Sequence, residues 1–319
     1  MLPINNRSSL DSANHINRYT KVDLHSHSTC SDGSFSPSEL LNKAFEVGID
    51  VFALTDHDTL AGINEAKAVA DEHGIHLING VEISVMHQVS GGYGKHSKHK
   101  LQDKIIHVLA LDFADTEKMG QALARIQSSR ANRGEQIVQK LATLIEVPFA
   151  ELWQEVLAHA DGKPEAVGRV HIAKVLVERE HVPTVQKAFD KFLADNKPAY
   201  VAIESLSMAE AITLIHDCGG VAVLAHPTRY GLSATRVRKL ISDFAEMGGD
   251  ACELPSNDEP ISKRQMIDRQ IAEHGLKVSV GSDFHGANMP WRRLGDVPRL
   301  NENQTLVLTQ KIDTQPTFN

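Results

Sequence analysis

Short apolar runs alternate with helical patterns along this chain, and this alternation limits its fold more than any other feature. In the first part of the chain the helical patterns stop at Gly48 and Gly74, where left-handed helix caps are expected. Strand–helix–strand units of this length imply parallel strands. We expect strands at Lys21–His25, Val51–Thr55, His76–Val81 and Lys104–Leu111, and helices at Pro37–Val47 and Ala61–His73.

The same alternation resumes after Tyr200. Gly219-Gly220 and Gly248-Gly249 again mark helix-to-strand turns. Repeated β/α units with polar residues at the strand ends favour a barrel over an open sheet. We expect further strands at Val221–Ala225, Ala251–Leu254 and Lys277–Val280, and helices at Met208–Cys218, Thr235–Met247 and Glu259–His274.

The middle of the chain has a different rhythm. Residues 116–198 show successive helical patterns without a convincing strand, over 117–144, 148–160, 168–180 and 184–195. We interpret this segment as an inserted helical subdomain, and the alternative is that it simply covers the barrel. The barrel domain then comprises 21–115 and 199–319, after a flexible polar segment at 1–20.

The stretch 87–103 is rich in Gly, Ser, Lys and His. Its three histidines, His87, His96 and His99, could indicate a metal site. A solvated, extended loop is the simpler explanation for such a polar composition.

The bulk properties exclude several classes of protein. A net charge of −8 over 319 residues argues against a generally basic nucleic-acid-binding surface, although bound metals can still create a local anion site. The cysteines Cys30, Cys218 and Cys252 are far apart, which favours reduced thiols over a disulfide or zinc–thiolate site. Without a membrane-spanning apolar run or a signal-peptide pattern, we expect a cytoplasmic location, no membrane partner and no stable protein partner.

The first strand ends in the motif His25-Ser26-His27, and Asp32 follows in the next turn. Alternate residues of a strand point to the same face, so the two imidazoles project side by side. Two imidazoles with a carboxylate nearby are typical of a metal site.

A histidine or a carboxylate recurs at the ends of later predicted strands. Any single case is weak, because a lone histidine at a strand end is more often a hydrogen-bonded core residue than a ligand. A series of them at equivalent ends of successive strands predicts a multinuclear metallohydrolase. The residues concerned are Asp56-His57-Asp58, Glu82, His107, His226, Asp283 and His285.

These motifs, taken in order, resemble those of the PHP (polymerase and histidinol phosphatase) superfamily. The resemblance runs from Val22 to His285. It implies an α/β fold, a distorted (βα)₇ barrel, and two or three divalent metal ions, with Mn²⁺ first and Zn²⁺ or Fe²⁺ as alternatives.

The resemblance also implies a division of the metal ligands. One metal takes His25, His27, Glu82 and Asp283; a second shares Glu82 and adds His107 and His226; a third takes Asp32, His57 and His285. His99 is the rival of His107, because the long preceding loop departs from the compact hairpin expected there. Asp56 and Asp58 flank a ligand, and we expect them to orient it rather than bind metal.

Further residues resemble a bacterial subgroup with a helical insertion, whose members act on nucleoside 3′,5′-bisphosphates (pAp-like) or on RNA 5′ ends as 5′→3′ exoribonucleases. The matching stretches are Gly168–Ala173, Lys197–Val201 and Ala225–Tyr230. The resemblance implies that Arg169, Lys197 and Arg229 bind substrate phosphates. Guanidinium and ammonium groups suit this role, because they donate charged hydrogen bonds to phosphate oxygens. Glu253 could contact sugar hydroxyls or only orient the residues at the rim of the site. No aromatic stacking platform is evident in the sequence.

The implied reaction is phosphoester hydrolysis, in which a metal-bridging hydroxide attacks phosphorus in line. His226 and Asp283 are the predicted catalytic residues, and either His226 or a metal-bound water protonates the leaving group. Two alternatives stay open: an amidohydrolase that cleaves C–N bonds, and a non-catalytic metal-binding module. The paired Asp283 and His285 and the bridging Glu82 favour the phosphoesterase.

Overall fold

The computed structural model describes residues 21–89, 102–160, 167–194, 197–201 and 205–308, together with Gly162 and Pro164. The chain forms two compact units. Unit 1 comprises Met1–Thr116 and Ser207–Asn319, and unit 2 comprises Glu117–Leu206.

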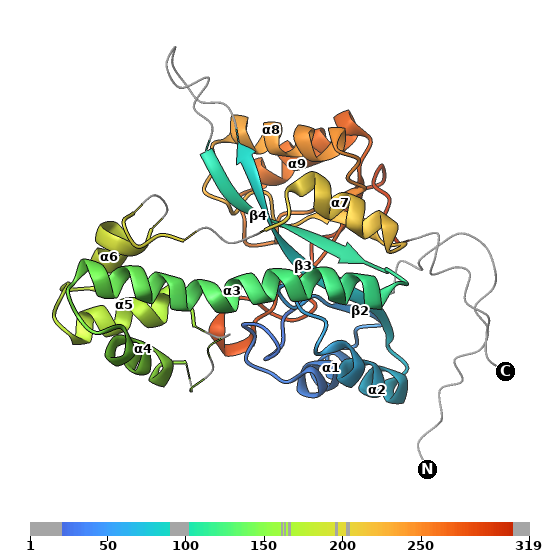
Figure 1. The fold of residues 1–319 in the computed structure, drawn as a ribbon. Helices are drawn as coiled ribbons and strands as arrows, with labels where there is room; N and C mark the ends of the chain where they lie inside the picture. The colour runs from blue at the N-terminus through green and yellow to red at the C-terminus, as the bar shows by residue number, and fades with distance from the viewer. Residues whose placement is uncertain are drawn as a thin grey trace. The chain divides into compact units, whose positions relative to one another are not determined.

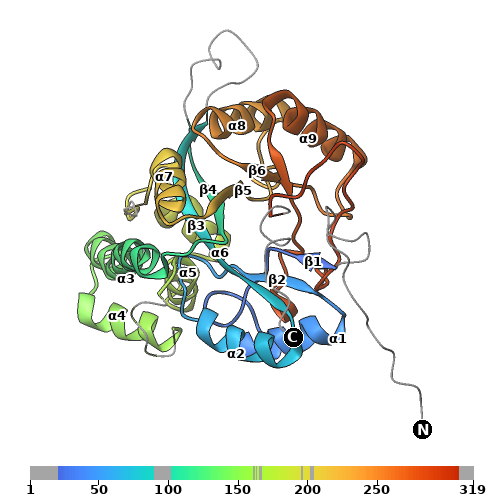
Figure 2. The ribbon, with the colours of Figure 1, turned by 90° about the vertical axis from the view of Figure 1, so that its right-hand side faces the viewer.

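Unit 1 is built on one seven-stranded sheet whose spatial order follows the chain order. The helices lie outside the curled sheet, α1 and α2 on one side and α8 and α9 on another (Figure 2). The strands are β1 (Val22–Asp23), β2 (Val51–Leu54), β3 (His76–Val89), β4 (Gln102–Leu111), β5 (Val221–Leu224), β6 (Ala251–Glu253) and β7 (Lys277–Ser279).

The first and last strands meet and close the sheet. Leu24 N–H donates to Val280 O at 3.0 Å, and Asp283 N–H donates to His25 O at 2.9 Å. A parallel bridge between Ser26 and Phe284 continues this contact. The expected distorted (βα)₇ barrel is therefore confirmed.

One strand of the barrel runs against its neighbours. β4 pairs antiparallel with both β3 and β5, while the other neighbouring strands are parallel. The reason is connectivity: β3 and β4 follow each other in the chain with no helix between them among the described residues, and they pair antiparallel as a long hairpin (Figure 1). The rule for strand–helix–strand units therefore does not apply to them.

The hairpin also corrects the expected loop at 87–103. β3 continues to Val89 and β4 already begins at Gln102, so the ends of that stretch are strand. His87 is buried, and its Nε2 lies 3.3 Å from Asp243 Oδ2 on α8. The prediction of a solvated His87 was wrong, because the extended β3 packs against α8. His96 and His99 lie outside the described residues.

The helices of unit 1 begin where local signals predict. Ser36 and Ser207 are N-caps with complete capping boxes, and Gly74 and Gly275 end their helices in the left-handed conformation. Such caps satisfy backbone groups that a helix end leaves without partners. These helices are α1 (Pro37–Glu46), α2 (Ile63–His73), α7 (Met208–Asp217), α8 (Ala234–Glu246) and α9 (Ile261–His274), followed by the 3₁₀ turn η3 (Gly286–Asn288).

Unit 2 is helical and has its own apolar core. Leu141, Leu152, Leu176 and Leu193 are among its fully buried side chains. Among the residues that the structure describes, no helix is long and apolar enough to cross a membrane. The helices are α3 (Thr116–Leu144), α4 (Phe149–Ala158), α5 (Arg169–Glu178) and α6 (Val185–Ala188), which continues into the π-helical turn η2 (Phe189–Leu193).

Candidate metal centre

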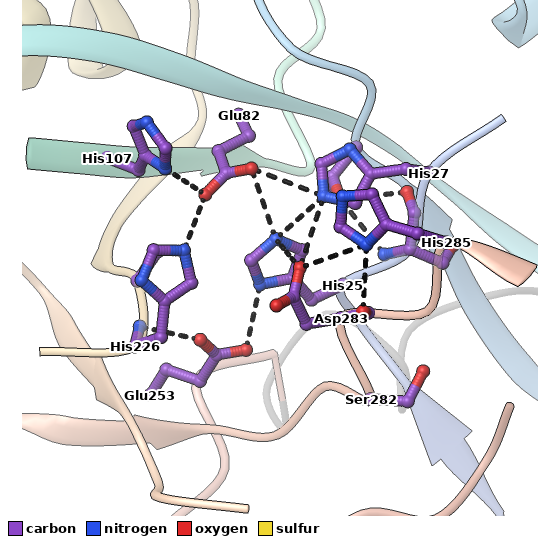
Figure 3. A network of polar contacts seen from close by, with 12 residues as sticks. His25, His27, Glu82, His107, His226, Glu253, Ser282, Asp283 and His285 are labelled. Atoms are coloured by element: carbon purple, nitrogen blue, oxygen red, sulfur yellow. Dashed lines mark hydrogen bonds and ion pairs between the residues drawn. The ribbon is translucent and has the colours of Figure 1, made fainter. Parts of the chain in front are cut away.

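The ligands expected from the sequence gather at one end of the barrel of unit 1. Figure 3 shows the carboxylate of Glu82 between His107 and His226 on one side and His25 and His27 on the other. Glu82 lies inside the longer β3 rather than at its end. All nine predicted ligands belong to four overlapping groups whose ligand atoms lie within 4.8 Å of one another: His25, His27, Asp32, His57, Glu82, His107, His226, Asp283 and His285.

Glu82 is the centre of this arrangement. Its side chain is 1% exposed. Oε1 lies 2.9 Å from both His107 Nδ1 and His226 Nε2, whereas Oε2 lies 3.2 Å from His27 Nε2 and 3.1 Å from His57 Nδ1. A carboxylate with histidines at both oxygens has the geometry of a bridging ligand.

The first group surrounds the opening motif. His25 Nε2 and His27 Nε2 are 3.1 Å apart, and each lies 3.4 Å from Asp283 Oδ1. Glu82 Oε2 is 3.3 Å from His25 Nε2. Two imidazole nitrogens and two carboxylates therefore converge on one point, as expected for the first metal.

The third group lies on the other side of His27. Asp32 Oδ1 is 3.2 Å from His285 Nε2, and Asp32 Oδ2 is 3.8 Å from His57 Nε2. The rings of His27 and His285 stack with their centroids 4.1 Å apart. The side chain of Asp32 is 57% exposed, so this group opens to solvent while the first is buried.

The atoms of the cluster fit divalent metal ions. His226 Nδ1 is buried without a hydrogen-bond partner among the described residues, and His57 Nδ1 and His107 Nδ1, although they lie 3.1 Å and 2.9 Å from oxygens of Glu82, are not aligned for hydrogen bonds. A buried polar atom without a hydrogen bond costs about 1–3 kcal/mol, so these nitrogens call for a ligand that the protein does not provide. Imidazole nitrogens and carboxylate oxygens without thiolate suit Mn²⁺, Fe²⁺ or Zn²⁺.

Burial and neighbouring charges shift the pKa values of the cluster's side chains in different directions. Burial lowers the pKa of His27, but its hydrogen bonds to Asp283 and Glu82 outweigh burial and raise that pKa to about 9. His57 responds in the opposite way, because burial lowers its pKa to about 3. Burial raises the pKa of Asp32, yet His285 and the neighbouring histidines bring it down to about 2. Without metal, this site therefore holds a proton on His27 and none on His57 at neutral pH.

Asp56 and Asp58 accept hydrogen bonds from backbone and serine groups next to the predicted ligands. Asp56 accepts hydrogen bonds from Ser28 N–H at 2.7 Å and from the hydroxyl of Ser31 at 2.6 Å. Asp58 accepts from Ser84 N–H at 2.7 Å. These contacts hold the chain on both sides of His57 and support the expected orienting role.

Glu253 also holds two ligands in place. Its Oε1 accepts from His25 Nδ1–H at 2.9 Å, and its Oε2 accepts from His226 N–H at 2.7 Å. His226 has a φ of 28°, a left-handed conformation that a side chain other than glycine rarely adopts. Of the two roles left open by the sequence, the structure supports orientation, and a contact with substrate stays a prediction.

Two supporting residues escaped the sequence analysis. Asp23 is buried and accepts hydrogen bonds from Ser282 N–H at 2.9 Å and Gly295 N–H at 2.8 Å. The hydroxyl of Tyr230 accepts from His107 N–H at 2.8 Å and donates to Ala225 O at 3.0 Å. The only signal was their nearness in sequence to the first motif and to His226.

The predicted phosphate-binding cations fall in different units. Arg229, in unit 1, donates to the carboxylate of Asp283 and to Ser256 Oγ at 3.2 Å. Arg169 and Lys197 belong to unit 2. Arg169 Nη1 donates to Leu193 O at 3.1 Å, and Lys197 is exposed. Their contact with substrate stays a prediction.

Comparisons with known proteins agree with this geometry. A 5′-3′ exoribonuclease of Haemophilus influenzae is 40% identical over 265 residues, which cover 83% of this chain and 90% of that protein. A 3′,5′-nucleoside bisphosphate phosphatase of Chromobacterium violaceum is 34% identical over 274 residues, 86% of this chain and 90% of that protein.

A solved structure from Chromobacterium violaceum, described as an amidohydrolase with bound sulfate and no metal, matches with a TM-score of 0.68 at 30% identity. The match covers 92% of this chain and 96% of that one. The family model of the PHP domain matches residues 23–204. The chain therefore belongs to the PHP domain family, as the sequence predicted, and the exoribonuclease and phosphatase that it resembles are phosphoester hydrolases.

Proposed function

We propose that this protein is a metal-dependent phosphoesterase that hydrolyses nucleoside 3′,5′-bisphosphates and the 5′ ends of short RNA. The observation that carries the proposal is the set of four overlapping ligand groups that includes the buried carboxylate of Glu82. The names of two relatives, an exoribonuclease and a bisphosphate phosphatase, supply the substrate class.

The ligand groups fit the division of metals that the family resemblance implies only in part. His25 and His27 lie with Asp283, as a first ion would need, whereas His226 lies with His25 and Glu82, and His107 lies with His57 and Glu82. In the proposed division His25, His27, Glu82 and Asp283 would hold one ion, and Glu82, His107 and His226 would hold a second. The open group of Asp32, His57 and His285 would hold a third. We propose Mn²⁺ as the ion, because the family resemblance puts it first; the donors, imidazoles and carboxylates only, suit Mn²⁺, Fe²⁺ and Zn²⁺ alike. Such ions, when bound, lower the pKa of a bound water and neutralise charge on phosphoryl oxygens.

The protein's own residues would then position the substrate. Arg229 lies beside Asp283 and is only partly exposed, so its guanidinium can hold a phosphoryl oxygen next to the ligand groups. His226 Nε2 faces Glu82 at 2.9 Å and serves as a ligand. The proton for the leaving group would therefore come from His226 Nδ1–H or from water.

Arg169 and Lys197 would bind the phosphate that does not react. Arg169 lies at the start of α5, where helix N–H groups also favour an anion. In this proposal unit 2 provides selectivity for substrates with a second phosphate, while the chemistry belongs to unit 1.

A direct assay tests the proposal. Mn²⁺-loaded protein is incubated with pAp, a short 5′-phosphorylated RNA, p-nitrophenyl phosphate and an amide substrate, and chelator-treated protein serves as the control. We expect phosphate or mononucleotide from the phosphoesters and none after chelation. Turnover of the amide alone would instead support the amidohydrolase, the description attached to the similar Chromobacterium violaceum structure.

A further inference from the structure

We infer that the segment Gly286–Gly295, which follows the last metal-ligand motif, is a binding edge for a nucleoside phosphate. In this inference Arg292 binds a phosphate and Trp291 stacks on the nucleobase. The inference rests on the proposed function, because it assumes that the substrate is a nucleotide.

The segment is fixed to the metal centre at both ends. It begins directly after His285, and Asn288 Nδ2 donates to the backbone oxygen of Asp32 at 2.7 Å. At its far end Gly295 N–H donates to the buried carboxylate of Asp23 at 2.8 Å. Trp291 and Arg292 therefore lie on a short connection anchored beside the ligand groups.

Arg292 has the features of an anion-binding side chain. Its side chain is 10% exposed, and its Nη1 lies 3.1 Å from Asp258 Oδ1. Its Nε is buried and has no hydrogen-bond partner among the described residues. An arginine binds phosphate with paired N–H groups, and Asp258 occupies only one side of this guanidinium.

Arg229 shows the same feature, and the two arginines are linked. Arg229 Nε is also buried without a hydrogen-bond partner in the described part of the chain, and it forms an ion pair with Glu259 Oε1 at 3.7 Å. Its Nη2 donates to Ser256 Oγ at 3.2 Å, two residues before Asp258, the partner of Arg292. Both guanidinium groups thus contact the loop 256–258, and that of Arg229 also lies beside the metal ligand Asp283.

This arrangement suits a substrate with two phosphates. A phosphate at Arg229 would lie beside the ligand groups, and the second phosphate of the same nucleotide, or the next phosphodiester of an RNA, would bind Arg292. Arg292 is thus the alternative to Arg169 and Lys197 for this second phosphate, and the Arg292→Gln and Arg169→Ala variants distinguish the two. The carboxylate of Asp258 is 58% exposed, so solvent screens its repulsion of the anion.

Trp291 supplies the stacking surface that the sequence did not reveal. It is 65% exposed, whereas Phe45, the other strongly exposed aromatic side chain in the described ranges, stacks on the ring of His73. An exposed indole next to a phosphate-binding arginine is the combination that holds single nucleotides and RNA ends, because every base has a face to stack.

Kinetics of single variants test the inference. The Mn²⁺-loaded Arg292→Gln and Trp291→Ala variants are compared with wild type on pAp, a 5′-phosphorylated RNA and p-nitrophenyl phosphate. We expect kcat/KM for the two nucleotides to fall about tenfold, and at least fivefold more than for p-nitrophenyl phosphate. Arg292→Lys should restore part of the loss. Arg293→Gln, a change at the exposed neighbour, is the matched control.

The outcomes separate the inference from the function on which it rests. If wild type hydrolyses none of the phosphoesters, the proposed function is wrong. If wild type hydrolyses pAp or RNA but the variants lose equal activity on all substrates, or lose no more than Arg293→Gln, the binding edge is wrong. A loss for RNA alone, or for pAp alone, identifies which nucleotide the edge serves.

A second measurement does not depend on turnover. The chain has two tryptophans, Trp153 and Trp291, so the Trp153→Phe variant leaves Trp291 as the single indole. Its fluorescence should change on titration with pAp in chelator-treated protein, and not with inorganic phosphate. An unchanged spectrum at saturating pAp, with binding verified by equilibrium dialysis, would overturn the stacking of Trp291.

Discussion

The two units bury different kinds of side chain. Among the described residues, every buried polar or charged side chain lies in unit 1, and many of them face one another around Glu82. The buried residues of unit 2 are apolar, and its predicted phosphate ligands Arg169 and Lys197 are at least partly exposed. Unit 1 therefore buries the polar and charged side chains of its site, at a cost in free energy, whereas unit 2 is stabilised by ordinary hydrophobic packing and tolerates changes in its exposed cations.

Removal of the bridging carboxylate is the strongest test of this contrast. Glu82→Ala leaves five histidines without a shared partner, so we expect kcat to fall on the order of 10³-fold and metal content to drop by at least one ion. Kinetics and elemental analysis of the purified protein measure both. Glu46→Gln, at an exposed position of α1, is the control; retention of metal and activity by Glu82→Ala would exclude a bridging role.

Core truncations compare the units directly. Leu176→Ala in unit 2 and Leu54→Ala in unit 1 each remove a buried side chain and should cost about 2–5 kcal/mol of unfolding free energy. Only Leu54→Ala should also reduce metal content, because Leu54 directly precedes the turn that carries His57. Hydrogen exchange locates the destabilised unit, and elemental analysis measures the metal. Equal metal loss in both variants would contradict the assignment of all ligands to unit 1.

Glu253→Gln tests the support of the ligands. Both oxygens of Glu253 accept from N–H groups. In the glutamine variant one of these oxygens becomes an NH₂ group, which cannot accept, so one of the two hydrogen bonds is lost. We expect the metal affinity to weaken about 10–100-fold, with substrate KM changed less than kcat. A larger effect on KM than on metal affinity would instead favour a contact between Glu253 and substrate.

Metal uptake should release protons from unit 1 in a pH-dependent way. The pKa of His27 is about 9 without metal, above its usual value of about 6.5, so at pH 7.5 a metal must displace this proton. His57, with a pKa of about 3, should release none. For each displaced proton, the metal affinity should therefore fall about tenfold with every pH unit below 9. Calorimetry in buffers of different ionisation enthalpy counts the protons, and no release at pH 7.5 would contradict the site's assignment.

The raised pKa of His27 also makes the stability of the metal-free protein depend on pH. Because the folded pKa of His27 lies above the unfolded value, its protonation stabilises the metal-free fold fully below about pH 6.5, and this contribution is lost as pH rises through about 9. The free energy of unfolding of chelator-treated protein is measured at pH 6 and at pH 9.5. We expect His27 to add stability at pH 6 and not at pH 9.5, so His27→Asn should destabilise the protein more at pH 6 than at pH 9.5.

The smallest expected effect belongs to unit 2. Arg169→Ala should reduce kcat/KM for pAp about tenfold, the loss of one charged hydrogen-bonding partner, and reduce turnover of p-nitrophenyl phosphate much less. Arg179→Ala, which removes ion pairs to Glu151 and Glu155 away from the start of α5, is the control. Equal losses on both substrates would exclude a phosphate clamp at Arg169.

The barrel and the clustering of the nine predicted ligands were predictable from the sequence for a local reason. A strand that ends in His-x-His points both rings to one face, and repeated strand–helix units place the ends of successive strands together. Caps such as Ser36 with Glu39 also act within a few residues. These signals are local, so one sequence is sufficient to read them.

Other features depended on contacts between distant residues. The antiparallel β4, the burial of His87 against Asp243, the hold of Glu253 on His25 and of Tyr230 on His107, and the link from Arg229 to Arg292 each join residues far apart in the chain. No periodicity or spacing encodes such partners, because burial and hydrogen bonding are decided only when the sheet closes. The sequence alone determined which side chains could bind metal, and the tertiary structure decided which of them share a carboxylate and which residues hold them there.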